Sequence, residues 1–413
     1  MSRLSPRSFR VCSIRPASVM PRGRDPPPGV FVSSWTTLSS ARDSRCWAES
    51  PDRDPTTSRA FFEALETSGS AARAAGWLPL HLESAGAGVV VPLYAKSHSY
   101  GEYVFDHGWA HAAQRAGMRY YPKLLTAVPF TPSEGRRLIG PGAAADPGLA
   151  AGQALAAAKV LAERSGASSW HVLFPAEAEL EAWQATGMLH RLGCQYHWFD
   201  RDYGDFEGFL AHFRASRRKT LRRERRAVAE QGIRVETLEG AAIEPRHWEV
   251  LDQCYRLTYL KRSGHEGYLT PTFFGRLAES LGDRVVLMLA WHEGRAVAAA
   301  LCLRSDDTLY GRYWGALADY PQLHFELCYY QGIEYCLRRG LRRFDPGAQG
   351  EHKIPRGFEP VLTHSFHWLA EPALAEAVDD FLQQERRHVR AYAETARQDL
   401  PFHRDGTAPE ARS

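Results

Sequence analysis

The sequence repeats one order of elements, a β-hairpin followed by a helix and a short strand, and this repetition limits the fold more than any other feature. Each copy begins with two strand-like segments around a glycine-containing turn and continues into a Tyr-Gly pair: Leu80 to Glu83, Val89 to Tyr94 and Tyr100-Gly101 in the first copy, and Val285 to His292, Ala296 to Arg304 and Tyr310-Gly311 in the second. Apolar strand pairs joined at such turns are typical of β-hairpins.

Each copy continues with a helix, a glycine and a short strand: Leu149 to Ser165, Gly166 and Ser169 to Phe174, and Gln322 to Arg339, Gly340 and Leu341 to Asp345. A glycine just past the last helical turn is the usual C-cap, because it adopts the left-handed conformation without strain. The repetition predicts two copies of one α/β unit that differ in their insertions.

The chain is longer than one ordinary core, since cores stop growing near roughly 250 to 300 residues and this chain has 413. We predict a first domain at 29–196, a second at 197–370, and a C-terminal helix and tail at 371–413. The N-terminal segment 1–28 is expected to be a disordered tail or the product of an over-extended start codon. Its six arginines without an acidic residue in the first 24 positions also fit a transit peptide.

Composition excludes several classes of protein. The formal net charge of +3 is too small for a general nucleic-acid coat, so any polyanion site requires local clustering of basic residues. The seven cysteines are scattered without a CxxC pair, which predicts reduced thiols in the cytoplasm and no structural zinc site. No apolar stretch reaches the roughly eighteen residues of a transmembrane helix. We expect no integral membrane segment and no metal site, and the oligomeric state stays open.

A helix expected over 205–231 lies between the two copies and is strongly basic. An apolar stripe in its first turns is followed by eight basic residues: Arg214, Arg217, Arg218, Lys219, Arg222, Arg223, Arg225 and Arg226. Like charges at this density repel one another unless an anion is near, so we predict an anion site for the phosphates of RNA, a nucleotide-linked precursor or a lipid headgroup. The residues expected to bind are Arg218, Lys219, Arg222 and Arg223. A solvated helix surface is the alternative interpretation.

The segment from Asp345 to Pro360, DPGAQGEHKIPRGFEP, concentrates glycines and charged residues between the second helix and a strand. Glycines at this density let backbone N–H groups converge on a ligand and leave the side chains free for chemistry. A loop that only had to turn would need far fewer charged groups. We therefore predict a functional site whose members are Gly347, Gln349, Gly350, Glu351, His352, Lys353 and Arg356.

This segment resembles the signature of the FemAB-like proteins, a group within the GNAT-type acyltransferase superfamily that is connected with peptidoglycan biosynthesis or recognition. Three further segments extend the resemblance from about Trp35 to about Phe402: KSHSYGEYVFDHGWA from Lys96, RYYPKLLTAVPFTP from Arg119 and HFELCYYQGIEYC from His324. The resemblance implies a mixed α/β fold class with two tandem GNAT-like domains, whose mixed central sheets are flanked by helices.

The resemblance also implies an enzyme of the N-acyltransferase type, which moves an acyl or aminoacyl group onto an amine of a small molecule or peptidoglycan precursor. Acyl-CoA and aminoacyl-tRNA are the candidate donors, so tRNA is a candidate partner, and no cofactor is assigned. CoA-dependent members hold the pyrophosphate on a Q/R-x-x-G-x-G/A loop at a helix start. That pattern is absent from the equivalent junction at 313–324 and only loosely approximated at 136–142.

Such a transfer needs a group that accepts the proton of the attacking amine and donors for the developing oxyanion. We assign proton transfer to Glu351 or His352 and anion binding to Lys353 and Arg356. Glu102 and Glu326 are further catalytic candidates. The predicted substrate groove contains Tyr100, Tyr103, Asp106, Tyr313, Trp314, His324, Gly347, Gln349 and Gly350. Core packing of the aromatic rings and helix capping by His324 and Glu326 are the structural alternatives.

Two other classes of function remain open. A non-catalytic recognition protein for a peptidoglycan precursor or RNA would use the same groove and basic helix, and its binding would survive Glu351→Gln. A metal-dependent hydrolase would need three of the side chains His98, His324, Glu326 and His352 to converge. Their spacing lacks the i, i+4 pairing of helical metal sites.

Overall fold

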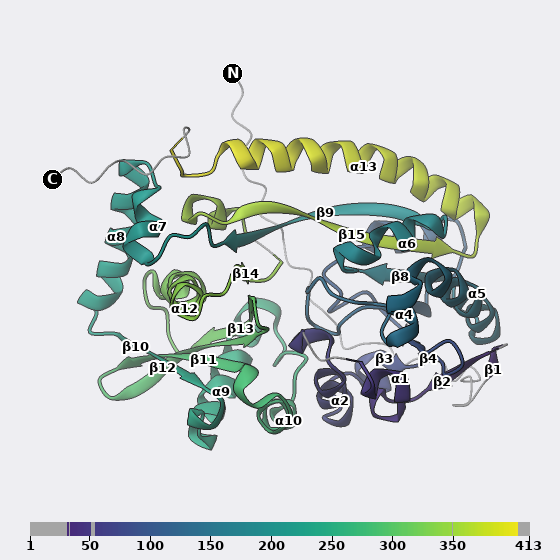
Figure 1. Cartoon of the computed structure of the whole chain (residues 1–413), viewed down its shortest axis with the longest axis horizontal. Helices are drawn as coiled ribbons and strands as arrows, with labels where there is room; N and C mark the ends of the chain where they lie inside the picture. Colours follow the sequence, from purple (N-terminus) through teal and green to yellow (C-terminus); the bar gives the residue numbers. More distant parts are fainter. Residues whose placement is uncertain (1–30, 33, 51–53, 349, 404–413) are drawn as a thin grey trace.

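The computed structural model describes residues 31–32, 34–50, 54–348 and 350–403, so the predicted tail at 1–28 lies outside the described residues. Within them, eleven strands form one continuous sheet (Figure 1). In sheet order they are β10 (Arg234–Glu239), β11 (Val285–His292), β12 (Arg295–Arg304), β13 (Thr308–Ala316), β14 (Arg343–Asp345), β9 (Leu189–Phe199), β15 (Glu359–Leu369), β8 (Ser169–Leu173), β7 (Lys123–Thr126), β6 (Tyr94–Lys96) and β3 (Trp77–Pro79).

A second, four-stranded sheet contains β1 (Phe31–Val32), β2 (Trp35–Leu38), β4 (His81–Ser84) and β5 (Val89–Val91). The longer helices are α2 (Arg59–Thr67), α3 (His107–Arg115), α5 (Pro147–Ser165), α8 (Ala215–Glu230), α9 (Pro245–Ser263), α10 (Pro271–Leu281), α12 (Gln331–Arg339) and α13 (Pro372–Gln398). The last of these packs along β9 and β15 at the top of Figure 1. Among the described residues, no helix combines the length and apolar character that crossing a bilayer requires.

The helix and strand part of the repeat appears in the large sheet as two parallel strand pairs, β7 with β8 and β13 with β14. The hairpin part differs, because β4 and β5 pair in the four-stranded sheet, whereas β11 and β12 pair in the large sheet. The connection within each parallel pair contains a helix, α5 or α12, which ends at a left-handed glycine. These caps are Gly166 (φ 65°) and Gly340 (φ 69°), as the sequence predicted. The predicted fold class, mixed α/β with two copies of one unit and helices flanking the mixed sheet, is confirmed.

The two copies exchange strands at the centre of the large sheet. Strand β9 of the first copy pairs with β14 of the second, while β15 of the second pairs with β8 of the first. The two exchanged strands also pair with each other in antiparallel orientation. The domain boundary predicted after residue 196 falls inside β9, and a division of the chain into domains there stays a prediction.

The basic segment 205–231 forms two helices, so the prediction of one continuous helix is wrong. Between α7 (Phe206–Ala211) and α8 (Ala215–Glu230), Arg214 has a ψ of 139°, which no helical residue adopts. The buried Phe213 packs on Phe402, with ring centroids 5.1 Å apart, and its backbone forms a bridge to the same residue. This contact with a residue far along the chain interrupts the helix, because the bridge uses backbone groups that the helix would need.

Helix α9 lies close against β13 because residue 315 is a glycine. A Cβ atom at Gly315 would lie 2.0 Å from the carbonyl oxygen of Cys254 on α9. Since that oxygen belongs to helix backbone, an added methyl group would displace the helix and not merely a side chain.

We expect Gly315→Ala to lower the free energy of unfolding by about 1 to 3 kcal/mol, the range typical of overpacking. Urea titration followed by circular dichroism measures this change. The matched control is Gly275→Ala on α10, where a Cβ atom would meet nothing within 4 Å. Alanine is favoured over glycine in a helix, so the control should gain about 0.5 to 1 kcal/mol. Equal stability of the two variants would contradict the tight contact between α9 and β13.

Candidate functional site

The central pocket opens where the parallel strands β13 and β14 separate. Their pairing ends at Tyr310 and Asp345. Strand β13 continues to Ala316, whereas the segment that follows β14 turns away from it at Pro346. The resulting cavity has a volume of about 420 Å³. Its polar and aromatic lining consists of Tyr103, Tyr255, Thr258, Tyr259, Arg262, Ser263, Cys302, Arg312, Tyr313, Trp314, His324, Cys328, Tyr329, His352 and Lys353.

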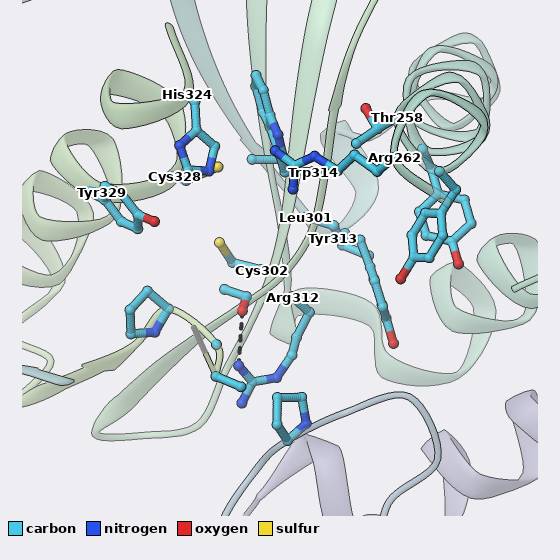
Figure 2. A pocket seen from close by; sticks show the side chains of 18 of the residues that line it. Thr258, Arg262, Leu301, Cys302, Arg312, Tyr313, Trp314, His324, Cys328 and Tyr329 are labelled. Carbon is cyan, nitrogen blue, oxygen red and sulfur yellow. Dashed lines mark hydrogen bonds between the residues drawn. The ribbon is translucent and has the colours of Figure 1, made fainter. Parts of the chain in front are cut away.

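Figure 2 shows how the elements contribute to the central pocket. Thr258 and Arg262 reach it from α9, while His324 and Tyr329 lie on the opposite, helical wall. That wall is formed by the short helix α11 (Leu323–Phe325) and the π-helical segment η7 (Glu326–Tyr330). Segments of π-helix frequently occur at functional sites, because they displace the side chains from regular α-helical positions.

A β-bulge in β13 directs Arg312 toward β14. Leu301 pairs with Tyr313 and Cys302 with Gly311, so Arg312 is the extra residue between them. Its Nη2 atom lies 2.6 Å from the Asp345 Oδ2 atom, and both side chains are only 1% exposed. Burial alone would raise the pKa of Asp345, but the Arg312 guanidinium holds that pKa well below its usual range.

The same carboxylate positions Lys353 through one glycine. The backbone N–H of Gly347 donates to Asp345 Oδ1 at 2.9 Å, and its carbonyl accepts from Lys353 Nζ at 2.6 Å. Burial lowers the pKa of Lys353 to about 8. Because a lysine is cationic below its pKa, Lys353 carries a positive charge at neutral pH and loses it in mildly alkaline solution.

Two neutral histidines face the central pocket. Burial, together with nearby His352 and cationic side chains, lowers the pKa of His324 to about 3. Burial and the charges of Lys353 and Arg356 also lower the pKa of His352, whose Nε2 atom lies 2.7 Å from the Tyr329 hydroxyl. His324 forms no hydrogen bond with any residue that the structure describes. Both rings are therefore uncharged at neutral pH and can accept a hydrogen bond from a ligand.

Gly350 provides the space that the His352 ring occupies. Its φ of +117° is unfavourable for other residues, and a Cβ atom there would lie 2.1 Å from the His352 Cε1 atom. The glycine was predicted to bind substrate; it is not among the pocket-lining residues and packs against the histidine.

The charge of the pocket lining is one-sided. Arg262 and Lys353 supply cationic groups that pair with no described carboxylate, the charge of Arg312 is compensated by Asp345, and no described aspartate or glutamate lines the cavity. Arg262 forms no ion pair or hydrogen bond with a described residue. The central pocket therefore favours anionic or neutral groups of a ligand and disfavours an ammonium ion.

Seven of the predicted site residues meet at the central pocket: Tyr103, Tyr313, Trp314, His324, Gly347, His352 and Lys353. Gln349 lies outside the described residues. The other predicted catalytic and substrate-binding residues lie elsewhere and have protein partners, and their roles stay predictions.

Glu102 and Asp106 belong to a buried ionic cluster in the first copy. Lys123 Nζ donates to Glu102 Oε2 at 2.7 Å and also to Asp106 Oδ2, and Lys96 Nζ lies 3.8 Å from Glu102 Oε1. Burial raises the pKa of Glu102 to about 7, although Lys123 opposes this shift. The partly exposed Tyr100 accepts a hydrogen bond from Lys96 at its backbone carbonyl, 3.2 Å away.

The remaining predicted acids and Arg356 join helices to one another. Glu326 accepts two hydrogen bonds from Arg225 of α8, at 2.9 and 3.1 Å. Glu351 accepts from the Tyr392 hydroxyl of α13 at 2.7 Å. Arg356 donates to both carboxylate oxygens of Glu224 at 2.8 Å.

Helix α8 presents part of the predicted anion site to solvent. Lys219 and Arg223 are exposed and have no ion-pair or hydrogen-bond partner among the described residues. Arg222 pairs with Glu207, and Arg218 approaches the Ala211 carbonyl at 3.5 Å.

Of the four side chains considered for a metal centre, His324 and His352 meet at the central pocket, but His98 and Glu326 do not join them. His98 Nε2 contacts the Ala75 carbonyl at 3.0 Å in the first copy, and Glu326 pairs with Arg225. In the described parts of the chain, no three His, Cys, Asp or Glu side chains are arranged to hold a metal ion.

Comparison with known protein families matches residues 33–404 to the FemAB-like model, which is described as peptidoglycan biosynthesis/recognition. The chain belongs to the FemAB-like family. The resemblance noted from the motifs is thereby confirmed. No curated protein matches the chain.

Among solved structures, the chain is similar to FemX, with 12% identity, 84% of this chain and 99% of that chain covered, and a TM-score of 0.49. It is also similar to L-PGS from Bacillus licheniformis, with 12% identity, coverage of 81% and 98%, and a TM-score of 0.45. A third is a tandem GNAT protein from the clavulanic acid biosynthesis pathway, with 13% identity, coverage of 82% and 98%, and a TM-score of 0.43.

In this FemAB-like chain, sequence reasoning missed the contribution of α9 to the pocket. Tyr255, Thr258, Tyr259 and Arg262 recur at helical spacing of three or four residues, a signal that marks one helix face but not what the face covers. Arg312 was visible beside the Tyr310-Gly311 pair, but only the bulge in β13 directs it toward Asp345.

Asp345→Ala should lower the free energy of unfolding by about 3 to 5 kcal/mol, because it leaves the Arg312 charge buried without its partner. Denaturant titration measures the change. Glu394→Ala removes a carboxylate from an exposed pair with Arg397 and should cost about 0 to 1 kcal/mol. A loss at Asp345 no larger than this control would show that the buried pair does not hold β13 and β14 together.

Proposed function

We propose that this FemAB-like protein transfers an acyl or aminoacyl group to an amine in the central pocket. The observation that carries the proposal is the gap between the parallel strands, where cationic groups and two neutral histidines meet without a carboxylate. Where two parallel strands separate, a substrate can lie between them and receive hydrogen bonds from both. The proposal extends the family's connection with peptidoglycan biosynthesis to a reaction.

The pocket's groups match the steps of such a transfer. The attacking amine must be unprotonated, and the positive charges of Arg262 and Lys353 lower the pKa of an ammonium ion nearby. When the amine nitrogen bonds to the acyl carbon, its proton passes to His352 and the same cations stabilise the carbonyl oxyanion. The bond to the leaving group then breaks, and the leaving group departs with the electron pair and takes up a proton.

The donor and acceptor classes follow from the surroundings of the pocket. The family description supports a peptidoglycan precursor as the amine acceptor. Acyl-CoA and aminoacyl-tRNA remain the candidate donors, and the exposed cations of α8 suit the phosphates of either. A cytoplasmic reaction agrees with the six cysteines that the structure describes as free thiols.

Variants of the neighbouring residues His352 and Glu351 test which of the two side chains accepts the proton. His352→Gln should lower the transfer rate by roughly 100-fold to 10,000-fold, the usual contribution of a general base. Glu351→Gln removes a carboxylate that contacts Tyr392 outside the pocket and should retain the rate. The assay incubates purified protein with radiolabelled acyl-CoA or aminoacyl-tRNA and a peptidoglycan nucleotide precursor, and detects the amide product by mass spectrometry.

A large loss of transfer rate in Glu351→Gln, with the rate retained in His352→Gln, would contradict the role of His352. Saturable binding of the precursor without product from any donor would favour the recognition function instead. Product formation that survives His352→Gln would leave transfer in place but assign proton transfer to another group.

The anion site on α8 is tested separately with a charge-reversed pair. Lys219→Glu/Arg223→Glu should weaken binding of tRNA. It should also reduce the slope of log binding constant against log salt concentration by about 0.7 to 0.9 per lost phosphate contact. Filter binding over a series of salt concentrations measures both. The control Arg115→Glu/Arg295→Glu changes the same charge at exposed positions away from α8. An equal loss of tRNA affinity in both variants would show that binding depends on the net charge of the protein and not on α8.

A further inference from the structure

A groove adjoins the central pocket on the surface of the second copy. It has a volume of about 630 Å³ and lies between the C-terminal half of α9 and the end of β13. Thr258, Arg262 and Trp314 line both the groove and the central pocket, so the two cavities share a wall. A ligand in the groove would therefore lie directly beside the central pocket.

The walls of the groove contain a cluster of exposed apolar side chains. Leu257, Leu260 and Leu317 are 45%, 44% and 41% exposed, and they are three of the eight large apolar side chains that stand out to solvent in the described residues. All three line the groove, together with Ala316 and Ala318. Exposed apolar side chains scattered singly need no explanation, but a cluster in a groove marks a binding surface.

The charges at the groove are arranged for an amphiphile. Lys261 is neutralised by Asp319 at 2.6 Å on the rim, whereas Arg262 at the junction with the pocket has no described partner. The groove thus has apolar walls and a single unpaired cation where it enters the pocket. A hydrocarbon chain that ends in an anionic or strongly polarised oxygen group complements both features.

We propose that this groove holds the hydrocarbon chain of a long-chain acyl donor, with its carbonyl group at Arg262. This inference rests on the proposed transferase function and narrows its donor to a fatty acyl group. The chain would lie over Leu257, Leu260 and Leu317, and the carbonyl carbon would face the histidines of the central pocket. The phosphates of a carrier or of the acceptor remain available to α8.

The test measures binding of linear fatty acids, which carry the acyl chain with a carboxylate in place of the activated carbonyl. Isothermal titration of the full chain with butanoate, hexanoate, octanoate and decanoate, each below its micelle concentration, should show affinity rising about threefold to fourfold per methylene. Leu257→Ser/Leu260→Ser should flatten this rise and leave the affinity for butanoate unchanged. Leu149→Ser is the control, because Leu149 on α5 is 58% exposed and lies outside the groove.

Several outcomes would overturn the inference. Affinity independent of chain length, or a rise that Leu257→Ser/Leu260→Ser leaves intact, would show that the chain binds elsewhere or not at all. A concentration-dependent dimer in sedimentation that the double variant abolishes, without a chain-length effect, would assign the leucines to a second copy of the protein.

The binding and transfer measurements together distinguish a failure of the groove proposal from a failure of the transferase proposal. A chain-length effect that depends on the leucines, without transfer from any donor, would support the groove and contradict the transferase. Transfer from short acyl donors alone, with no chain-length effect in binding, would support the transferase and contradict the groove.

Discussion

The buried ion pair between Arg312 and Asp345 is the interaction on which the site depends. It joins β13 to β14 just beyond the last backbone pair, Tyr310 with Asp345, so the strands are held together at the point where they begin to separate. Arg312 also donates to Ser133, and Arg343 contacts Glu134 at 2.9 Å, so residues of the first copy hold the same ends of β13 and β14. Because the charges are buried, the pair is costly to break, and the pocket beside it keeps its shape.

The first copy has a comparable cluster with a different outcome. Lys123 stands on β7, the first strand of its parallel pair, as Arg312 stands on β13. There the cation is enclosed by Glu102, Asp106 and Ser99, with no exposure of the Lys123 side chain. Lys123 precedes the residues of β7 that pair with β8, whereas Arg312 follows the residues of β13 that pair with β14. Both cations have buried carboxylate partners, but only Arg312 borders the central pocket. The two copies of the fold are therefore not chemically equivalent.

The basic helix shows how tertiary contacts sort a run of like charges. Arg225 turns inward to Glu326 and Glu334, each at hydrogen-bond distance, and its guanidinium lies 4.5 Å from the Phe206 ring. These carboxylates are the anions that a dense row of arginines requires, and they come from the chain itself. Lys219 and Arg223 are left without such partners. The exposed Arg217 and Arg226 also have no ion-pair or hydrogen-bond partner among the described residues, so this face of the helix has charge available for a polyanion.

The sequence alone determined the repeated α/β unit, both glycine caps and the family, because hydrophobic periodicity, glycine stops and long motifs are local properties. It also pointed to the loop that carries His352 and Lys353. It did not determine which predicted residues meet. Phe402 interrupts the basic helix, the exchange of β9 and β15 merges the two copies, and the bulge in β13 brings Arg312 to Asp345. Each depends on partners that are distant in sequence, and local patterns do not specify them. Tertiary structure therefore decided that Glu102 and Glu326 are paired with cations, whereas His324 faces an open cavity.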